Sequence, residues 1–370
     1  MNALKGIRVL DFTTLLPGPL ATLMLVDAGA EVIKVEKLGG EDMRKTSPII
    51  KGNSLLFSLL NRGKKSIEID LKNKKNKDKI LKLIQNVDVV VEQFRPGVMK
   101  RLGLDWQTLN KINKKLVYCS ITGYGQKGKK KLFAGHDLNY MAESGLLSLS
   151  TSKDGTPIIP NTQIADIAGG SYPAFMNIVL GLFKAIKTNK GSYLDISMYE
   201  NLIPLAWLGI SDYFIKKKPP VKNRLPLNGG YHRYFIYETF DKNFLAVGAL
   251  EDKFWLKFCE IIKAPKSIIM EIDKPAIIIK KIQKLIKAKS SLYWKKKFSR
   301  ENNVCCTPVE NIENLFKDSH LLKKNLLPKK NKEGNFIPKI PTVVDNKSLI
   351  IKNKSKVPLL AEHNYIINEL

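Results

Sequence analysis

Short apolar segments alternate with helical segments between residues 7 and 214, and this alternation restricts the fold more than any other feature. Residues 87–91 (VDVVV) form a nearly continuous apolar run, which is typical of a strand buried on both faces of a parallel sheet. Further strands are predicted at 7–12, 31–36, 67–71, 116–121 and 191–197. Helices are predicted at 17–27, 74–85, 106–112, 172–186 and 198–214. The connections between these elements are short, so the pattern predicts an α/β fold with a doubly wound, Rossmann-like parallel sheet.

The chain has 370 residues, which is more than one ordinary domain, so a second domain is expected. The segment 216–226 (KKKPPVKNRLP) combines charge with three prolines, as linkers do. Strands are then predicted at 234–239 and 244–249, and helices at 252–262, 277–287 and 291–298. This order predicts a smaller α+β domain. Residues 323–356 are polar and rich in lysine, and we expect them to wrap the surface.

The net charge is +28, from 62 basic and 34 acidic residues, and a nucleic-acid-binding protein is therefore one hypothesis. The lysines are spread over the whole chain, however, and do not alternate with aromatic residues as in a single-strand-binding groove. Runs such as 127–131 are interpreted as solvated surfaces. We expect no nucleic-acid partner, but the charge would attract an anionic small molecule.

The four cysteines have neither the spacing of a zinc site nor that of a disulfide framework, which favours a reducing, cytoplasmic setting. The first 26 residues contain Asp11 and a Pro-Gly-Pro turn, unlike a signal peptide. No apolar run approaches the length of a membrane span, so no membrane partner is expected.

Basic residues follow several of the predicted strands. No Gly-x-Gly-x-x-Gly motif follows the first strand, so a dinucleotide cofactor is not indicated. Lys37, Lys72 and Arg95 each come after a strand, and ligands of such sheets bind at the carboxyl ends of the strands. Together with the basic loop 61–65, these cations would hold phosphate groups well.

The stretch Gly135-His136-Asp137-Leu138-Asn139-Tyr140 places a histidine beside an aspartate at the predicted start of a helix. We expect Asp137 to cap this helix, with the apolar positions Leu138, Met141, Gly145 and Leu149 continuing it. The first backbone N–H groups of a helix have no internal partner and suit an oxygen that gains negative charge. A surface turn with an incidental histidine explains these residues equally well.

Three titratable residues form the best candidate catalytic set: His136, Asp166 and Glu251. Two bases on opposite faces of a carbon acid would make a racemase or epimerase. An aspartate that attacks a carbonyl would instead form an anhydride and make a transferase. Residue spacing does not distinguish these two chemistries.

Motifs along almost the whole chain resemble the family III CoA-transferase superfamily, and more closely its α-methylacyl-CoA racemase branch. These motifs are LLPGP at 15–19, GAEVIKVE at 29–36, RGKKS at 62–66, DLK at 70–72, FRPGV at 94–98, GYGQ at 123–126, GHDLNY at 135–140, ADIAGG at 165–170, AVGALE at 246–251 and TPV at 307–309. The histidine of GHDLNY decides for the racemase branch, since similar transferases usually carry tyrosine there.

The resemblance implies that His136 and Asp166 are the two bases and that Glu251 pairs with His136. It implies that the CoA thioester contacts Lys37, Asp70, Leu71, Lys72, Arg95, Gly135, Asp137, Asn139 and Tyr140. No metal and no separate cofactor are implied. It further implies an interlocked homodimer, with each active site between the large domain of one subunit and the small domain of the other. The large domain would comprise 1–213 and, where the chain returns, 326–370; the small domain would comprise 214–325.

The chain departs from the family pattern at three places. The Gly-Pro that commonly follows GYGQ is Gly128-Lys129, and the closing Gly-Glu-His-Thr is AEHN at 361–364. The arginine usual at the adenine is Lys37, which keeps the charge but loses planar stacking. None of these departures touches the predicted bases. The expected activity is racemisation of 2-methylacyl-CoA thioesters through an enolate, with CoA transfer through an Asp166 anhydride as the alternative.

Overall fold

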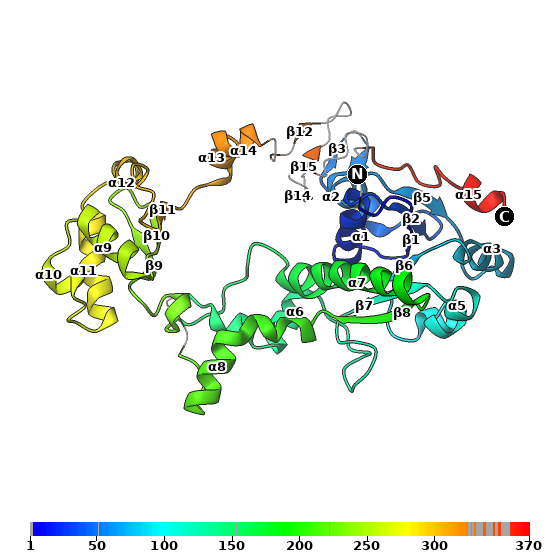
Figure 1. Cartoon of the computed structure of the whole chain (residues 1–370), viewed down its shortest axis with the longest axis horizontal. Helices are drawn as coiled ribbons and strands as arrows, with labels where there is room; N and C mark the ends of the chain where they lie inside the picture. The colour runs from blue at the N-terminus through cyan, green and yellow to red at the C-terminus, as the bar shows by residue number, and fades with distance from the viewer. Residues whose placement is uncertain are drawn as a thin grey trace. The chain divides into compact units, whose positions relative to one another are not determined.

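A computed structural model describes residues 3–50, 52–152, 154–221, 223–324 and 356–370, with Leu327 and four two-residue strands between them (Figure 1). The chain divides into two compact units. The first contains Met1–Ser144, Pro160–Pro204 and Leu322–Leu370, and the second contains Gly145–Ile159 and Leu205–Leu321. The domain boundaries predicted from the sequence fall after residues 213 and 325 and leave 145–159 in the large domain. Most of the predicted surface segment 323–356 lies outside the described residues.

The first unit is built on a six-stranded sheet in the order β5-β2-β1-β6-β7-β8, and every pair of neighbours is parallel. Its strands are β1 (Arg8–Asp11), β2 (Glu31–Glu36), β5 (Lys65–Glu68), β6 (Val89–Glu92), β7 (Val117–Thr122) and β8 (Ser192–Ser197). In chain order this is 3-2-1-4-5-6, the Rossmann arrangement, in which the strand order reverses between β1 and β6. The predicted parallel sheet is confirmed, although β5 begins two residues before the predicted strand.

Helices cover both faces of this sheet (Figure 1). The helices of this unit are α1 (Pro17–Asp27), α2 (Leu55–Asn61), α3 (Lys74–Ile84), α4 (Val98–Leu102), α5 (Trp106–Ile112), α6 (Asp137–Glu143), α7 (Tyr172–Thr188) and α15 (Tyr365–Asn368). On one face, Ile80 of α3, Leu109 of α5 and Ile367 of α15 belong to one buried cluster. On the other face, α7 approaches β7 closely because Gly181 has no Cβ, which would lie 2.9 Å from Val117.

The second unit is α+β, as predicted. Its antiparallel sheet has the order β11-β10-β9, with β9 (Tyr234–Glu238), β10 (Phe244–Gly248) and β11 (Cys306–Pro308). The helices from Trp207 to Lys323 are α8 (Trp207–Lys216), α9 (Asp252–Ile261), α10 (Lys266–Ile269), α11 (Pro275–Lys287), α12 (Ser291–Phe298), α13 (Ile312–Leu315) and α14 (Ser319–Lys323). The last of them, α14, crosses the boundary between the two units. Trp255, Phe258 and Ile282 are among the residues of its buried core.

Minor two-residue strands complete the described chain. They are β3 (Ile49–Ile50), β4 (Asn53–Ser54), β12 (Lys329–Lys330), β13 (Phe336–Ile337), β14 (Val343–Val344) and β15 (Lys347–Ser348). Among the residues that the structure describes, no helix has the length and hydropathy needed to span a bilayer.

Two helix predictions were wrong. The helix predicted at 198–214 is two short 3₁₀ turns followed by α8, and Pro204, which has no N–H to donate, starts the second turn. The helix predicted to run from Asp137 through Leu149 ends at Glu143, because Gly145 adopts φ +81° and starts a separate 3₁₀ turn. Both segments are apolar enough to suggest a longer helix than the backbone forms.

Candidate active site

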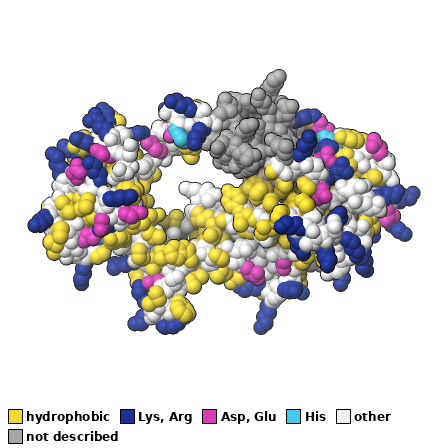
Figure 2. Space-filling view, viewed as in Figure 1, with side chains coloured by type: hydrophobic (Ala, Val, Ile, Leu, Met, Phe, Trp, Pro, Cys, Tyr) yellow, Lys and Arg dark blue, Asp and Glu magenta, His cyan; other side chains and the backbone are white. Residues whose placement is uncertain are grey.

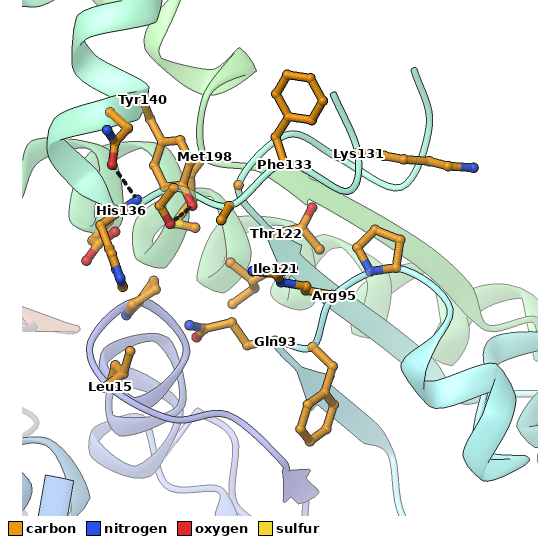
Figure 3. A pocket seen from close by; sticks show the side chains of 18 residues that line it. Leu15, Gln93, Arg95, Ile121, Thr122, Lys131, Phe133, His136, Tyr140 and Met198 are labelled. Carbon is orange, nitrogen blue, oxygen red and sulfur yellow. Dashed lines mark hydrogen bonds between the residues drawn. The ribbon is translucent and has the colours of Figure 1, made fainter. Parts of the chain in front are cut away.

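A cavity of about 420 Å³ opens at the carboxyl edge of the six-stranded sheet (Figure 3). Its walls come from the segments that follow β1, β6 and β7, so it lies where the strand order reverses, the usual ligand position in such sheets. Its lining residues include Leu15, Gln93, Arg95, Gly123, His136 and Asp166.

The loop after β1 is held in place by the buried carboxylate of Asp11. This carboxylate accepts hydrogen bonds from the Thr13 N–H (2.9 Å), the Thr22 hydroxyl (2.7 Å) and the Lys64 ammonium (3.0 Å). Burial alone would raise the pKa of Asp11, but the Lys64 and Lys34 charges hold it well below its usual range. The anchored loop carries Leu15, at φ +62°, to the edge of the cavity.

His136 is the residue before the first turn of α6, and its side chain is exposed at the cavity. Its N–H donates to the Asn139 Oδ1 (3.0 Å), and its carbonyl accepts from the Asn139 N–H (2.8 Å). Figure 3 shows the imidazole and the tips of the Gln93 and Arg95 side chains facing a common space. The backbone of His136 is therefore fixed while its ring stays accessible to a substrate.

Tyr140 explains Gly135 of the GHDLNY motif and Gly123 of the GYGQ motif. Its hydroxyl donates to the Gly135 carbonyl, and a Cβ on Gly123 would lie 2.5 Å from that hydroxyl. A Cβ on Gly135 would lie 2.7 Å from the Tyr140 ring. Tyr140 thus packs against two glycine backbones and sets the distance between α6 and the end of β7.

Asp137 does not cap its own helix, so that prediction was wrong. His136 occupies the cap position, and Asp137 is the first helical residue. Its Oδ1 instead accepts hydrogen bonds from the backbone N–H groups of Ala165 (2.6 Å) and Asp166 (3.1 Å). The Asp137 side chain therefore does not bind the first N–H groups of α6, which lack partners within the helix as at every helix start.

Asp166 lies in a π-helical turn, Ala165–Ser171, that leads into α7. Such turns are rare in proteins as a whole, but those that occur are frequently found at functional sites. A Cβ on Gly169 would lie 2.5 Å from the Met198 carbonyl oxygen, so only glycine allows this approach. Burial, together with the nearby Asp137 charge, raises the pKa of Asp166 to about 7. A carboxyl with this pKa can both give and take a proton near neutral pH.

A second cavity, of about 210 Å³, lies beside the first, and Phe94 lines both. Lys37 lines this second cavity, and its ammonium pairs with the Asp42 carboxylate at 2.8 Å. The structure therefore brings Lys37 and Arg95 to neighbouring cavities on the same sheet edge, as the positions of these cations after β2 and β6 predict.

Other predicted site residues line neither cavity. Asp70 accepts a hydrogen bond from the Lys72 N–H (2.9 Å) in the turn after β5, and Leu71 packs against the core. Glu251 belongs to the second unit, where it is the exposed residue before the first turn of α9. The roles of these four residues remain predictions.

Among the residues that line the main cavity, Gln93, Lys131 and Phe133 were not predicted from the sequence. Gln93 directly follows β6, and its Oε1 accepts the Gly18 N–H (3.0 Å), so its place at a strand end was a usable signal. Lys131 was interpreted as part of a solvated lysine run. The neighbouring Lys130 pairs with Glu143 of α6 and thereby ties this loop to the helix.

The sequence profile of CoA-transferase family III matches residues 4–364. The chain belongs to CoA-transferase family III. Mouse succinyl-CoA:glutarate CoA-transferase is 30% identical over 383 residues, which cover 100% of this chain and 87% of that protein. Human alpha-methylacyl-CoA racemase is 32% identical over 326 residues, which cover 86% of this chain and 80% of that one. The relatives of this family III enzyme thus include both transferases and racemases.

Solved structures agree with the fold. A CAIB/BAIF family protein from Brucella suis superposes with a TM-score of 0.84 at 24% identity, over 99% of this chain and 98% of that chain. The Mycobacterium tuberculosis protein Rv3272 superposes with a TM-score of 0.85 at 26% identity, over 99% of each chain. The similarity therefore extends over both units.

Proposed function

We propose that this family III enzyme is a racemase of 2-methyl-branched acyl-CoA thioesters. The observation that carries the proposal is that His136 and Asp166, from two different elements, line one cavity and are linked through Asp137. A histidine at this position is the feature that distinguishes the racemase branch in the sequence resemblance.

The reaction requires only proton transfers. One base removes the α-proton, and the electron pair of the broken C–H bond moves into an enolate whose oxygen takes the negative charge. The first N–H groups of α6, at Asp137 and Leu138, would stabilise that oxygen. The conjugate acid of the other base then protonates the opposite face of the carbon. His136 and Asp166 exchange roles in the reverse direction, so no electrons are gained or lost and no cofactor is needed.

The CoA thioester would be held by the predicted set of Lys37, Asp70, Leu71, Lys72, Arg95, Gly135, Asp137, Asn139 and Tyr140. Lys37 and Arg95 would supply positive charge for the phosphates. We propose that Glu251 pairs with His136 and keeps it basic. A carboxylate next to an imidazole fixes its tautomer and strengthens it as a base.

The proposal includes a homodimer, which an apolar stripe on α7 supports. Five large side chains spaced along one side of this helix are exposed to solvent: Tyr172, Met176, Leu180, Phe183 and Ile186. Ile186 is 73% exposed and Leu180 is 63% exposed, although both are aliphatic. Figure 2 shows hydrophobic side chains gathered over this part of the first unit. Contiguous apolar surface of this kind marks an interaction site.

Incubation of a single-enantiomer 2-methylacyl-CoA with the enzyme in deuterated water tests the proposal. We expect α-deuterium uptake together with inversion, detected by mass spectrometry and chiral chromatography. His136→Ala should slow uptake from the enantiomer that His136 deprotonates by about a hundredfold or more, the usual contribution of a general base. An enzyme that binds the thioester but incorporates no α-deuterium would exclude the proposal.

CoA transfer is the second candidate, because several relatives are transferases and Asp166 is accessible from the cavity. In this reaction the Asp166 carboxylate would attack the thioester carbonyl, and a mixed anhydride would form as the C–S bond breaks and CoA thiolate leaves. Trapping of an Asp166 hydroxamate with hydroxylamine, and a rate that depends on a carboxylate acceptor, would favour this reaction over racemisation.

A further inference from the structure

A cluster of polar and charged side chains, two of them buried, lies next to Glu251 in the second unit. It consists of His232 and Arg233, which precede β9, Glu271, which follows α10, and Asp252 at the start of α9. His232 and Arg233 are 2% and 7% exposed, so burying these two side chains costs desolvation energy that exposed residues would not pay. None of the motifs recognised in the sequence includes these residues.

The Glu271 carboxylate holds the Arg233 guanidinium in one orientation. Arg233 Nε donates to Glu271 Oε1 (2.6 Å), and Nη2 donates to Oε2 (2.9 Å), a two-point contact between planar groups. His232 Nε2 also contacts Oε1 at 2.6 Å. Although burial acts to raise the pKa of Glu271, its hydrogen bonds to Arg233 and His232 lower it overall. The carboxylate is thus ionised near neutral pH and accepts from both neighbours.

The opposite edge of the guanidinium holds the two residues that flank Glu251. Arg233 Nη1 donates to the Leu250 carbonyl at 2.8 Å and to the Asp252 Oδ1 at 2.7 Å. The Glu251 carbonyl in turn accepts the N–H groups of Phe254 and Trp255, both at 3.0 Å. The backbone of Glu251 is therefore fixed from both sides, while its side chain remains exposed.

We infer that Arg233 is a positioning residue that fixes the backbone of Glu251 and thereby places its carboxylate for catalysis. The inference rests on the proposed function, in which Glu251 supports the base His136. Arg233 touches neither substrate nor base; it acts by holding Leu250 and Asp252. A misplacement of about 1 Å can cost on the order of a hundredfold in rate, which is sufficient reason to keep a buried arginine here.

Lysine cannot replace this arginine. A guanidinium offers five N–H donors in a rigid plane. Arg233 makes four hydrogen bonds with them: two to Glu271, one to Leu250 and one to Asp252. An ammonium on a flexible stem keeps the charge but cannot reach both sides at once. Arg233→Lys therefore removes the positioning contacts but keeps a positive charge beside Glu271.

The first test measures backbone amide hydrogen exchange in the full-length protein. Arg233→Lys should speed exchange of the Leu250, Phe254 and Trp255 amides at least about tenfold and leave the amides of α11 unchanged. Arg300→Lys, an exposed substitution in the same unit, is the matched control. Unchanged exchange at these three amides in Arg233→Lys would overturn the inference, whatever the enzyme catalyses.

The second test is a double-mutant cycle on α-deuterium exchange. Arg233→Lys should slow the wild-type rate by about 10- to 100-fold, and it should have almost no effect in a Glu251→Gln background. If the two effects multiply, Arg233 acts through stability rather than through Glu251, and the inference is wrong. Absence of exchange in the wild type would instead contradict the proposed function, and the amide measurement would still decide the role of Arg233.

Discussion

The carboxylate of Asp137 accepts hydrogen bonds from the backbone N–H groups of Ala165 and Asp166, at 2.6 and 3.1 Å. Asp137 thereby performs two tasks for Asp166: it fixes the turn that carries this residue, and its negative charge helps burial to raise the Asp166 pKa to about 7. Position and acidity of the second base therefore depend on one neighbouring side chain.

Two substitutions at Asp137 separate these two tasks. Asp137→Asn keeps an acceptor oxygen but removes the charge, so the pKa of Asp166 should fall below about 7 while the turn stays in place. For the enantiomer that His136 deprotonates, Asp166 must start protonated, so the rate declines as pH rises through this pKa. That decline should move to lower pH in Asp137→Asn, as measured from kcat/KM against pH. Asp137→Ala should in addition lower kcat by about a hundredfold. An unmoved pH profile in Asp137→Asn would contradict this account.

Asp166→Asn should separate proton exchange from inversion. His136 can still remove the α-proton of one enantiomer and return a deuteron to the same face, but no acid remains on the other face. We expect deuterium uptake with retained configuration from that enantiomer, and a loss of inversion of at least about a hundredfold. His136→Ala is the matched control, because it should show the same behaviour with the opposite enantiomer. Equal loss of uptake and inversion in both variants would argue against two separate bases.

The sequence predicted the parallel sheet because its strands are buried on both faces and therefore read as apolar runs. Val89, Val90 and Val91 of β6 are all fully buried between the two helical layers. It also predicted that His136 and Asp166 belong to one site, first as titratable residues of one candidate set and then through the resemblance to a family. Local spacing predicted a helix that starts at this motif, but with Asp137 instead of His136 as the cap. It did not predict the helix length, since Gly145 ends the apolar pattern by its backbone conformation.

The sequence could not predict the contact from Asp137 to the turn that carries Asp166. The two segments are 28 residues apart, and the choice of partner depends on how α6 and α7 pack, not on a local pattern. The same holds for Lys131, whose neighbours in sequence are solvated lysines but which lines the cavity because Lys130 pairs with Glu143. The contacts of Arg233 could not be predicted for the same reason, because its partners lie 17 to 38 residues away in the sequence.

Gly169→Ala should disturb the Asp166 turn. The new Cβ would lie 2.5 Å from the Met198 carbonyl oxygen, and backbone cannot move away as a flexible side chain can. We expect a loss of about 1–3 kcal/mol in unfolding free energy and a lower kcat. Gly248→Ala is a control for stability, since its Cβ would meet nothing closer than 3.9 Å and should change the unfolding free energy by less than about 0.5 kcal/mol. Equal urea midpoints for the two variants would contradict the close approach.

Leu180→Lys should weaken the proposed dimer. Leu180 is 63% exposed in the middle of the apolar stripe on α7, and a charge there would have to be buried on association. We expect sedimentation velocity to show a larger monomer fraction at micromolar concentration. Lys111→Glu on α5, also a change of charge on an exposed helix, should leave the association state unaltered. A wild-type chain that sediments as a monomer would contradict the dimer itself.

Glu92→Gln should change how stability depends on pH. Glu92 lies at the end of β6 beneath the cavity and is only 3% exposed, and burial, with a contribution from the Asp195 charge, raises its pKa from 4.5 to about 7. Below pH 4.5 the carboxyl is protonated in both the folded and the unfolded state and contributes no pH dependence. Between pH 4.5 and 7 the unfolded chain releases the proton while the folded chain keeps it, so stability falls as pH rises. Above pH 7 the loss is complete and amounts to roughly 3 kcal/mol.

Glutamine has no proton to release, so Glu92→Gln removes this loss. Its Oε1 can still accept the Phe94 N–H, which Glu92 accepts at 2.8 Å. The variant should therefore gain stability relative to the wild type between pH 5 and pH 8, as measured by urea unfolding at both values. The gain arises because the wild-type protein must bury a charge at the higher pH and the variant need not. A stability difference that is the same at pH 5 and pH 8 would mean that Glu92 ionises as easily in the folded chain as in the unfolded one.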